Sequence, residues 1–213
     1  METKKYKLTN RTKKVNGHTL YRIKALKDVC DAKKGDLGGY IESEANLSQD
    51  GVAWIYDKAC VYGNAKVYEG AEVRHNAQIY DNAEVFGSAI IRYNAKVFGN
   101  AKIYDNAYAD DNAEVYGDAM IYAEASVFHH AVIKDKAEIF GQAEVGGQTI
   151  VCGVAKIYGH DVILRNGLFD GISNLSDIES KNLIQQGWES ELETAEMDTL
   201  DYISKHSEII QAK

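Results

Sequence analysis

The sequence predicts a mainly β protein built around a left-handed parallel β-helix, and a strict six-residue repeat is the main reason. Alanine stands at every sixth position from Ala53 to Ala143, and Thr149 and Ala155 continue the series. A branched aliphatic residue follows two positions after each of these residues, with Ala109 as the single lapse. A period of six does not fit a helix of 3.6 residues per turn, so the repeat indicates strands.

Each six-residue unit is interpreted as one short strand and one corner. The alanine and the aliphatic residue lie two apart, so both side chains point to the same side of a strand. Gly, Asp or Asn follow them, and Asn and Gly tolerate the left-handed backbone of a sharp corner. Three units close one triangular coil, so residues 53–160 should form about six coils, roughly 29 Å tall at the usual strand spacing.

Runs such as Val61-Tyr62-Gly63-Asn64-Ala65-Lys66 resemble the hexapeptide-repeat, left-handed β-helix superfamily. The resemblance covers about half of the chain and implies the fold and a homotrimer. The Ala-x-Val-Tyr-Gly-Asn form of the repeat follows the segment Lys34-Gly35-Asp36-Leu37-Gly38-Gly39-Tyr40. In this it is similar to proteins of phages and bacterial prophages, some of which are described as acyltransferases by fold analogy. Fold alone does not establish that activity.

The two ends of the chain differ from the repeat. Residues 1–50 are expected to form a β cap with a hairpin at Asn16-Gly17, a pair that suits a tight type I′ turn. The cap would cover strand edges at the open end of the β-helix, which is assigned to residues 51–166. Residues 167–213 are predicted to form a linker and two acidic helices, because Ser176-Asp177-Ile178-Glu179 and Ser190-Glu191-Leu192-Glu193 have the spacing of capping boxes.

Targeting signals and cysteine usage favour a cytoplasmic protein, and the resemblance to phage proteins implies the cytoplasm of a bacterial host. The net charge is −8, yet residues 1–34 carry a balance of +8 and residues 176–213 a balance of −6. We find no signal peptide and no apolar run long enough to span a membrane. Cys30, Cys60 and Cys152 are far apart and lack metal-ligand spacing. They are expected to be reduced thiols, and no metal or cofactor is predicted.

Positions 18 apart should stack on neighbouring coils, so the outward columns can be identified from the sequence. One column is wholly aromatic, and the resemblance makes it the expected interface of a homotrimer. A second aromatic column comprises Tyr62, Tyr80, Phe98 and Tyr116. The members of the expected interface are Tyr68, Phe86, Tyr104, Tyr122, Phe140 and Tyr158.

The third face departs from the repeat and therefore holds the candidate ligand-binding residues. Arg74 and Arg92 should lie about 5 Å apart on neighbouring coils, an arrangement that suits a bound phosphate. The alternative is that both arginines pair with Asp110, Asp111 or the neighbouring Glu72. The candidate ligand-binding residues are Lys58, Arg74, His75, Arg92, Tyr93, His129 and His130.

These features favour a non-catalytic binding protein that sequesters a small anionic, nucleotide-like host signal or a host defence component at a subunit interface. One alternative is an acyltransferase with His129 or His130 as its base, although no inserted loop interrupts the repeat. Another is a structural oligomer or an acidic protein mimic. Nucleic-acid binding through the basic N-terminal segment is disfavoured, because its lysines lack an interleaved aromatic platform.

Overall fold

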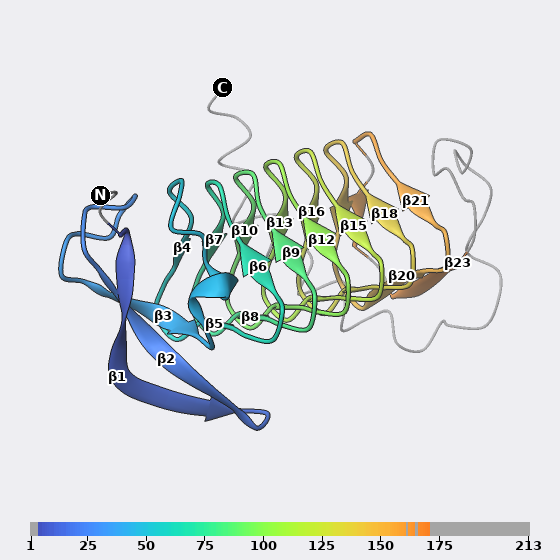
Figure 1. Cartoon of the computed structure of the whole chain (residues 1–213). Coiled ribbons are helices and arrows are strands. Elements are labelled where there is room, and N and C mark those ends of the chain that lie inside the picture. Colours follow the sequence, from blue (N-terminus) through green and yellow to red (C-terminus); the bar gives the residue numbers. More distant parts are fainter. Residues whose placement is uncertain (1–3, 161, 165, 171–213) are drawn as a thin grey trace.

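The protein forms a parallel β-solenoid of about seven turns, with a β-hairpin at its N-terminal end (Figure 1). The computed structural model describes residues 4–160, 162–164 and 166–170. The predicted C-terminal helices lie outside these residues. Within the described chain, the helical structure is a single 3-10 turn, η1 (Glu44–Asn46).

Three sheets form the faces of the solenoid. The first contains β3 (Leu37–Ile41), β5 (Cys60–Val61), β8 (Gln78–Ile79), β11 (Lys96–Val97), β14 (Glu114–Val115), β17 (Val132–Ile133), β20 (Thr149–Cys152) and β23 (Gly167–Asp170). The second contains β4 (Trp54–Ile55), β7 (Glu72–Val73), β10 (Ile90–Ile91), β13 (Tyr108–Ala109), β16 (Ser126–Val127), β19 (Glu144–Val145) and β22 (Val162–Ile163). The third contains β6 (Lys66–Val67), β9 (Glu84–Val85), β12 (Lys102–Ile103), β15 (Met120–Ile121), β18 (Glu138–Ile139) and β21 (Lys156–Ile157).

The repeat sets both the register and the core. Parallel partners on each face are one coil apart in sequence, as in Lys96 beside Glu114. The repeated alanines and aliphatic residues fill one continuous core, and even Ala109 is fully buried. The solenoid has more turns than the six expected coils because β3 extends it at one end and β22 and β23 at the other.

Left-handed backbone at the corners lets each coil turn tightly. Asp57, His75 and Asp111 have φ values of 51°, 58° and 55°. At the Gly87 corner φ is 67°, and an added Cβ would lie 2.6 Å from the backbone nitrogen of Asp105 on the next coil. Glycine is required there because neighbouring coils approach closely.

The hairpin predicted at Asn16-Gly17 is present. Strands β1 (Tyr6–Val15) and β2 (His18–Ala25) pair antiparallel, and the turn residues have φ values of 49° and 86°. Strand β2 pairs antiparallel with β3, which in turn pairs parallel with β5. The hairpin therefore continues the first sheet beyond the first coil.

Candidate functional site

Arg74 is held by carboxylates from two parts of the chain. Its guanidinium forms ion pairs of 2.9 Å with Asp31 and 2.6 Å with Glu72, and it lies 4.1 Å from the centre of the Tyr56 ring. Two carboxylates thus more than neutralise the guanidinium, and the aromatic ring covers one side of the cation.

Arg92 pairs with Asp110, the residue one coil further on. Nε donates a 2.7 Å hydrogen bond to one carboxylate oxygen, and the second guanidinium nitrogen donates to the other. These hydrogen bonds raise the pKa of Arg92 above its usual value. The alternative interpretation is thereby confirmed for two of its pairs, Arg74 with Glu72 and Arg92 with Asp110. The positive charge that would attract a shared anion is already neutralised.

His75 and Tyr93 are used in bonding between coils. Their rings stack on each other with centroids 4.6 Å apart and planes 2° apart. His75 Nδ1 accepts a 3.3 Å hydrogen bond from the backbone N–H of Tyr93, and Asp57 accepts one of 3.0 Å from the N–H of His75. Each corner side chain thus binds the backbone of the next coil, and one face of each stacked ring is covered.

His129 occupies the same kind of corner. Its Nδ1 accepts a 3.4 Å hydrogen bond from the N–H of Gly147, and its ring meets Phe128 edge-on at 4.9 Å. An Nδ1 that accepts a hydrogen bond places the proton of a neutral imidazole on Nε2. The nitrogen that could act as a base therefore faces the next coil. The adjacent His130 is exposed at the same corner.

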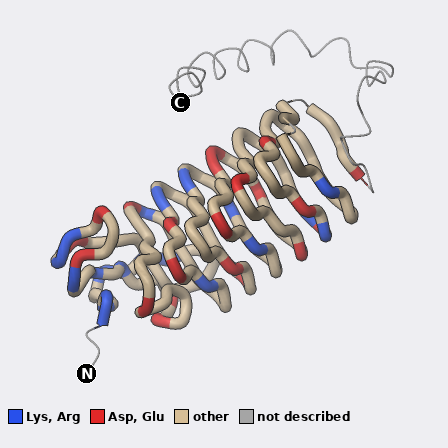
Figure 2. The backbone as a smooth tube through the Cα atoms, turned by 90° about the horizontal axis from the view of Figure 1, so that it is seen from above, with Lys and Arg blue, Asp and Glu red and all other residues tan. Residues whose placement is uncertain are grey.

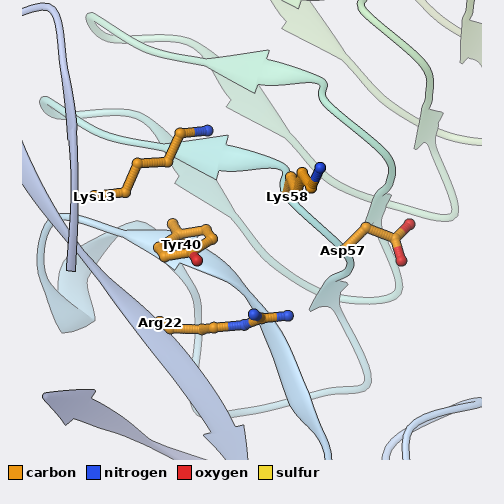
Figure 3. Close-up of a pocket in the computed structure, with 5 residues that line it drawn as sticks. All are labelled: Lys13, Arg22, Tyr40, Asp57 and Lys58. Atoms are coloured by element: carbon orange, nitrogen blue, oxygen red, sulfur yellow. The ribbon is translucent and has the colours of Figure 1, made fainter. Parts of the chain in front are cut away.

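A different group of cations surrounds a hollow where the hairpin meets the first coil. Lys13, Arg22, Tyr40, Asp57 and Lys58 line a space of about 370 Å³. Figure 3 shows the Tyr40 ring between the side chains of Lys13 and Arg22, with Lys58 to one side and Asp57 beyond it. The Lys13 ammonium lies 5.6 Å and the Arg22 guanidinium 5.5 Å from the ring centre. We refer to this space as the junction pocket.

Strand pairing brings the junction pocket together from distant parts of the sequence. Arg22 pairs with Tyr40, and Tyr40 pairs with Cys60 on β5, so these three side chains share the outer face of the first sheet. Leu20 is fully buried and packs with Cys60 and Tyr62. This small apolar cluster holds the hairpin against the outside of the solenoid.

Polar contacts also fix the hairpin over this face. Asn16, at the hairpin tip, donates a 3.0 Å hydrogen bond to the Tyr62 hydroxyl. The Glu42 carboxylate lies 2.9 Å from His18 Nδ1 and accepts a 2.8 Å hydrogen bond from the N–H of Gly63. The interaction with His18, followed by that with Gly63, lowers the pKa of Glu42. The hairpin wall of the pocket is therefore held in place.

The junction pocket carries an excess of positive charge. Arg22 donates a 3.0 Å hydrogen bond to the carbonyl of Gly38, a neutral acceptor, and Lys58 is exposed. Among the described residues, Lys13, Arg22 and Lys58 form no ion pair with a carboxylate. The lining carboxylate, Asp57, is engaged with the backbone N–H of His75. The lining thus holds three cations and one carboxylate.

The two aromatic columns are stacked along their lengths. In the expected interface, neighbouring rings lie 4.9–5.1 Å apart, nearly parallel, from Tyr68 to Tyr158. Stacking covers the ring faces and leaves the edges outward, so the rings are half-buried. In the second column Tyr62 is only 3% exposed, because the hairpin lies over it.

The described residues also limit other kinds of site. They contain no group of three His, Cys, Asp or Glu side chains placed to hold a metal ion. They include no helix long and apolar enough to cross a membrane. Cys30 is exposed, whereas Cys60 and Cys152 are buried, and all three are free thiols.

Of the seven predicted ligand-binding residues, the structure places only Lys58 at the junction pocket. Lys13, Arg22 and Tyr40 were missed. The basic balance of the N-terminal segment was the available signal, but it did not show which cations would lack carboxylate partners. That distinction depends on the pairing of β2 with β3 and of β3 with β5.

Comparison with known proteins gives a match to a family model. Residues 77–93 match the model described as the YdcK Beta solenoid repeat. This short stretch spans the end of one coil and the start of the next, and it supports a repeat protein of the β-solenoid class. No curated protein matches the chain.

Proposed function

We propose that the protein is a non-catalytic binding protein that holds a small anionic, nucleotide-like ligand in the junction pocket. The observation that carries the proposal is the convergence of Lys13, Arg22 and Lys58 on one hollow without carboxylate partners among the described residues. Like charges repel one another, so gathering them costs free energy that a bound anion would return. The guanidinium fork of Arg22 suits a phosphate or carboxylate group.

The groups that line the pocket suit a ligand that is bound without a reaction. The nearest thiol, Cys60, is buried, and its sulfur lies 3.4 Å from Lys13 Nζ. Burial raises the pKa of this thiol, which keeps it protonated and weakly nucleophilic. The pocket lining contains no histidine. These features support a ligand that is held and not converted.

The biological role follows from the resemblance to phage and prophage proteins. A left-handed coil inside a bacterial host, holding an anionic signal, would lower the free concentration of that signal in proportion to the amount of protein. This stoichiometric mode suits an anti-defence protein. A rigid solenoid serves it well, because the pocket is preformed and little ordering is required on binding.

We further propose that the chain assembles as a homotrimer through the aromatic column from Tyr68 to Tyr158. The ring edges form a continuous, largely apolar strip along the third face, in which the hydroxyls of Tyr68 and Tyr122 donate hydrogen bonds to Glu84 and Glu138. Contiguous apolar strips of this kind commonly mark protein interfaces. The resemblance to trimeric hexapeptide-repeat proteins supports the stoichiometry, and the junction pocket lies on a different sheet.

Calorimetric titration with ADP tests the binding proposal. We expect the wild type to bind ADP, and Lys13→Ala or Lys58→Ala to weaken binding about tenfold each, as expected for a lost charge-assisted hydrogen bond. Lys136→Ala is the matched control, because Lys136 is also exposed and has the same position within its six-residue unit. Failure of the wild type to bind, or equal weakening by Lys136→Ala, would contradict the proposal.

A further inference from the structure

The hairpin carries a row of cations on the face that also forms the junction pocket. Residues 6–25 contain six lysines and arginines and no aspartate or glutamate. Figure 2 shows that the coils beyond the hairpin instead carry basic and acidic segments side by side. The hairpin is therefore the part of the described chain where positive charge is not interleaved with negative charge.

Strand register shows which of these cations share a face. Lys7 pairs with Lys24, and Lys13 pairs with Leu20. Lys24, Arg22 and Leu20 alternate along β2, so their side chains lie on one face. That face is the outer one, because Arg22 pairs with Tyr40. Lys7, Lys24, Arg22 and Lys13 thus follow one another along the outer face of the hairpin, across an irregular register between Leu8 and Thr12 on β1, and end at the junction pocket.

The pairing of Lys7 with Lys24 is unfavourable in the free protein. Like charges directly opposite each other on antiparallel strands destabilise the pair. Among the described residues, neither lysine has an ion pair to offset this cost. A polyanion along the same face would remove the repulsion.

The length of the row selects the class of ligand. Lys24 and Leu20 are four residues apart on β2, a distance of about 14 Å along an antiparallel strand. A single phosphate group cannot reach both ends of such a row, whereas consecutive phosphates of a chain can. We infer that the ligand of the junction pocket is one end of a linear chain of phosphate groups that continues along the hairpin toward Lys7 and Lys24.

This inference rests on the proposed function and extends it to a longer ligand. A single-stranded oligonucleotide and inorganic polyphosphate both have the required chemistry. In the sequence, the lysines of the N-terminal segment lack an interleaved aromatic platform, which disfavours nucleic acid. The sheet supplies one from β3, because Tyr40 lies between Lys13 and Arg22. Basic grooves with aromatic rings are typical of single-strand binding sites.

Binding measurements with three probes test the inference: ADP, an oligothymidylate about eight nucleotides long, and inorganic polyphosphate of about the same charge. We expect the two chains to bind at least about tenfold more tightly than ADP at low salt, because each added phosphate contact releases counterions. Tighter binding of the oligothymidylate than of polyphosphate would identify nucleic acid as the source. Equal or weaker binding of the oligothymidylate would identify the phosphate chain alone.

Lys7→Ala and Lys14→Ala form a matched pair of variants on β1. Both residues are exposed, but Lys14 pairs with Thr19 and lies on the opposite face. We expect Lys7→Ala to weaken chain binding about fivefold and to reduce the salt dependence by about one counterion. Its ADP affinity should stay within about twofold of wild type, and Lys14→Ala should change neither affinity.

Two outcomes separate failure of the inference from failure of the proposed function. If ADP binds and the chains bind no more tightly, or if Lys7→Ala and Lys14→Ala behave alike toward the chains, the extended site is wrong and the junction pocket stands. If none of the three probes binds the wild type, both proposals fail.

Discussion

The ammonium of Lys5 donates a 2.9 Å hydrogen bond to the carbonyl of Ala53 inside the N-terminal end of the solenoid. In later coils, the carbonyl at this position accepts from a backbone N–H of the preceding coil, as Ala71 does from Trp54. Strand β4 is the edge strand of its sheet, so no strand precedes Ala53 there, and the fully buried Lys5, just before β1, supplies the donor. The first coil is thus completed by a side chain in place of a backbone.

Burial lowers the pKa of Lys5 to about 8 from its ordinary value of 10.5. Between these two values the unfolded chain binds more protons than the folded one, so the free energy of unfolding should rise with pH. We predict that wild-type stability increases from pH 8 to pH 9.5 relative to Lys5→Met, measured by urea unfolding. Parallel pH profiles for the two proteins would contradict a buried, titrating Lys5.

Asn46 completes the first coil in the same way. Its side-chain amide donates hydrogen bonds of 2.9 Å to the carbonyls of Gly63 and Ala65. Asn46→Asp should destabilise the protein by about 3 kcal/mol, because it replaces a buried donor with a carboxylate that faces two carbonyls. Asn112 is exposed, and its side-chain oxygen accepts a hydrogen bond from the Asn94 amide. A carboxylate oxygen can accept the same bond, so Asn112→Asp should be nearly neutral in its effect on stability. Chemical denaturation measures the free energy of unfolding of both variants. Equal losses of stability would contradict the role of Asn46.

Arg92 should contribute to stability and not to ligand binding. Arg92→Ala leaves the half-buried Asp110 carboxylate without its guanidinium partner, at a cost of about 1 kcal/mol. Affinity for ADP should stay within about twofold of wild type, because the pair lies outside the junction pocket. A tenfold loss of affinity in Arg92→Ala, with no loss in Lys58→Ala, would restore the arginine site predicted from the sequence.

Glu42 should make the attachment of the hairpin sensitive to acid. Its folded-state pKa lies below the ordinary value of 4.5, so its contribution is present above that value and is lost as the pH falls through the folded pKa. Glu42→Gln retains an acceptor for the N–H of Gly63 and does not titrate. Thermal unfolding should therefore show a smaller loss of stability below pH 4.5 for Glu42→Gln than for wild type, and identical losses would refute this role.

The proposed trimer makes a prediction that distinguishes the two aromatic columns. Tyr104→Glu places a charge in the middle of the expected interface, whereas Phe98→Glu places one in the other column. Light scattering should give a trimer for wild type and Phe98→Glu and a monomer for Tyr104→Glu, provided that thermal unfolding shows both variants to be folded. A monomeric wild type would exclude the assembly.

The repeat was sufficient to predict the core and the stacking of the coils. Side chains such as Ala53 and Ile55 recur at a fixed interval, and burial of each depends on residues within its own unit and one coil away. The Asn16-Gly17 hairpin was equally local, because its turn conformation depends on two residues. The winding sense and the trimer stay predictions.

The periodicity of the sequence is enough to predict a stack of coils with an alanine and aliphatic core, because local periodicity and burial agree at every unit. Only the tertiary structure decided which cations remain without carboxylate partners. Arg74 pairs with Asp31 from a distant loop, while Lys13 of the hairpin and Lys58 of the first coil line one pocket. Which charged residues come close depends on long-range strand pairing, and the free energy of an ion pair changes when the distance between its charges changes by a few ångströms. A repeat of six residues encodes neither the long-range strand pairing nor the distances between these charges.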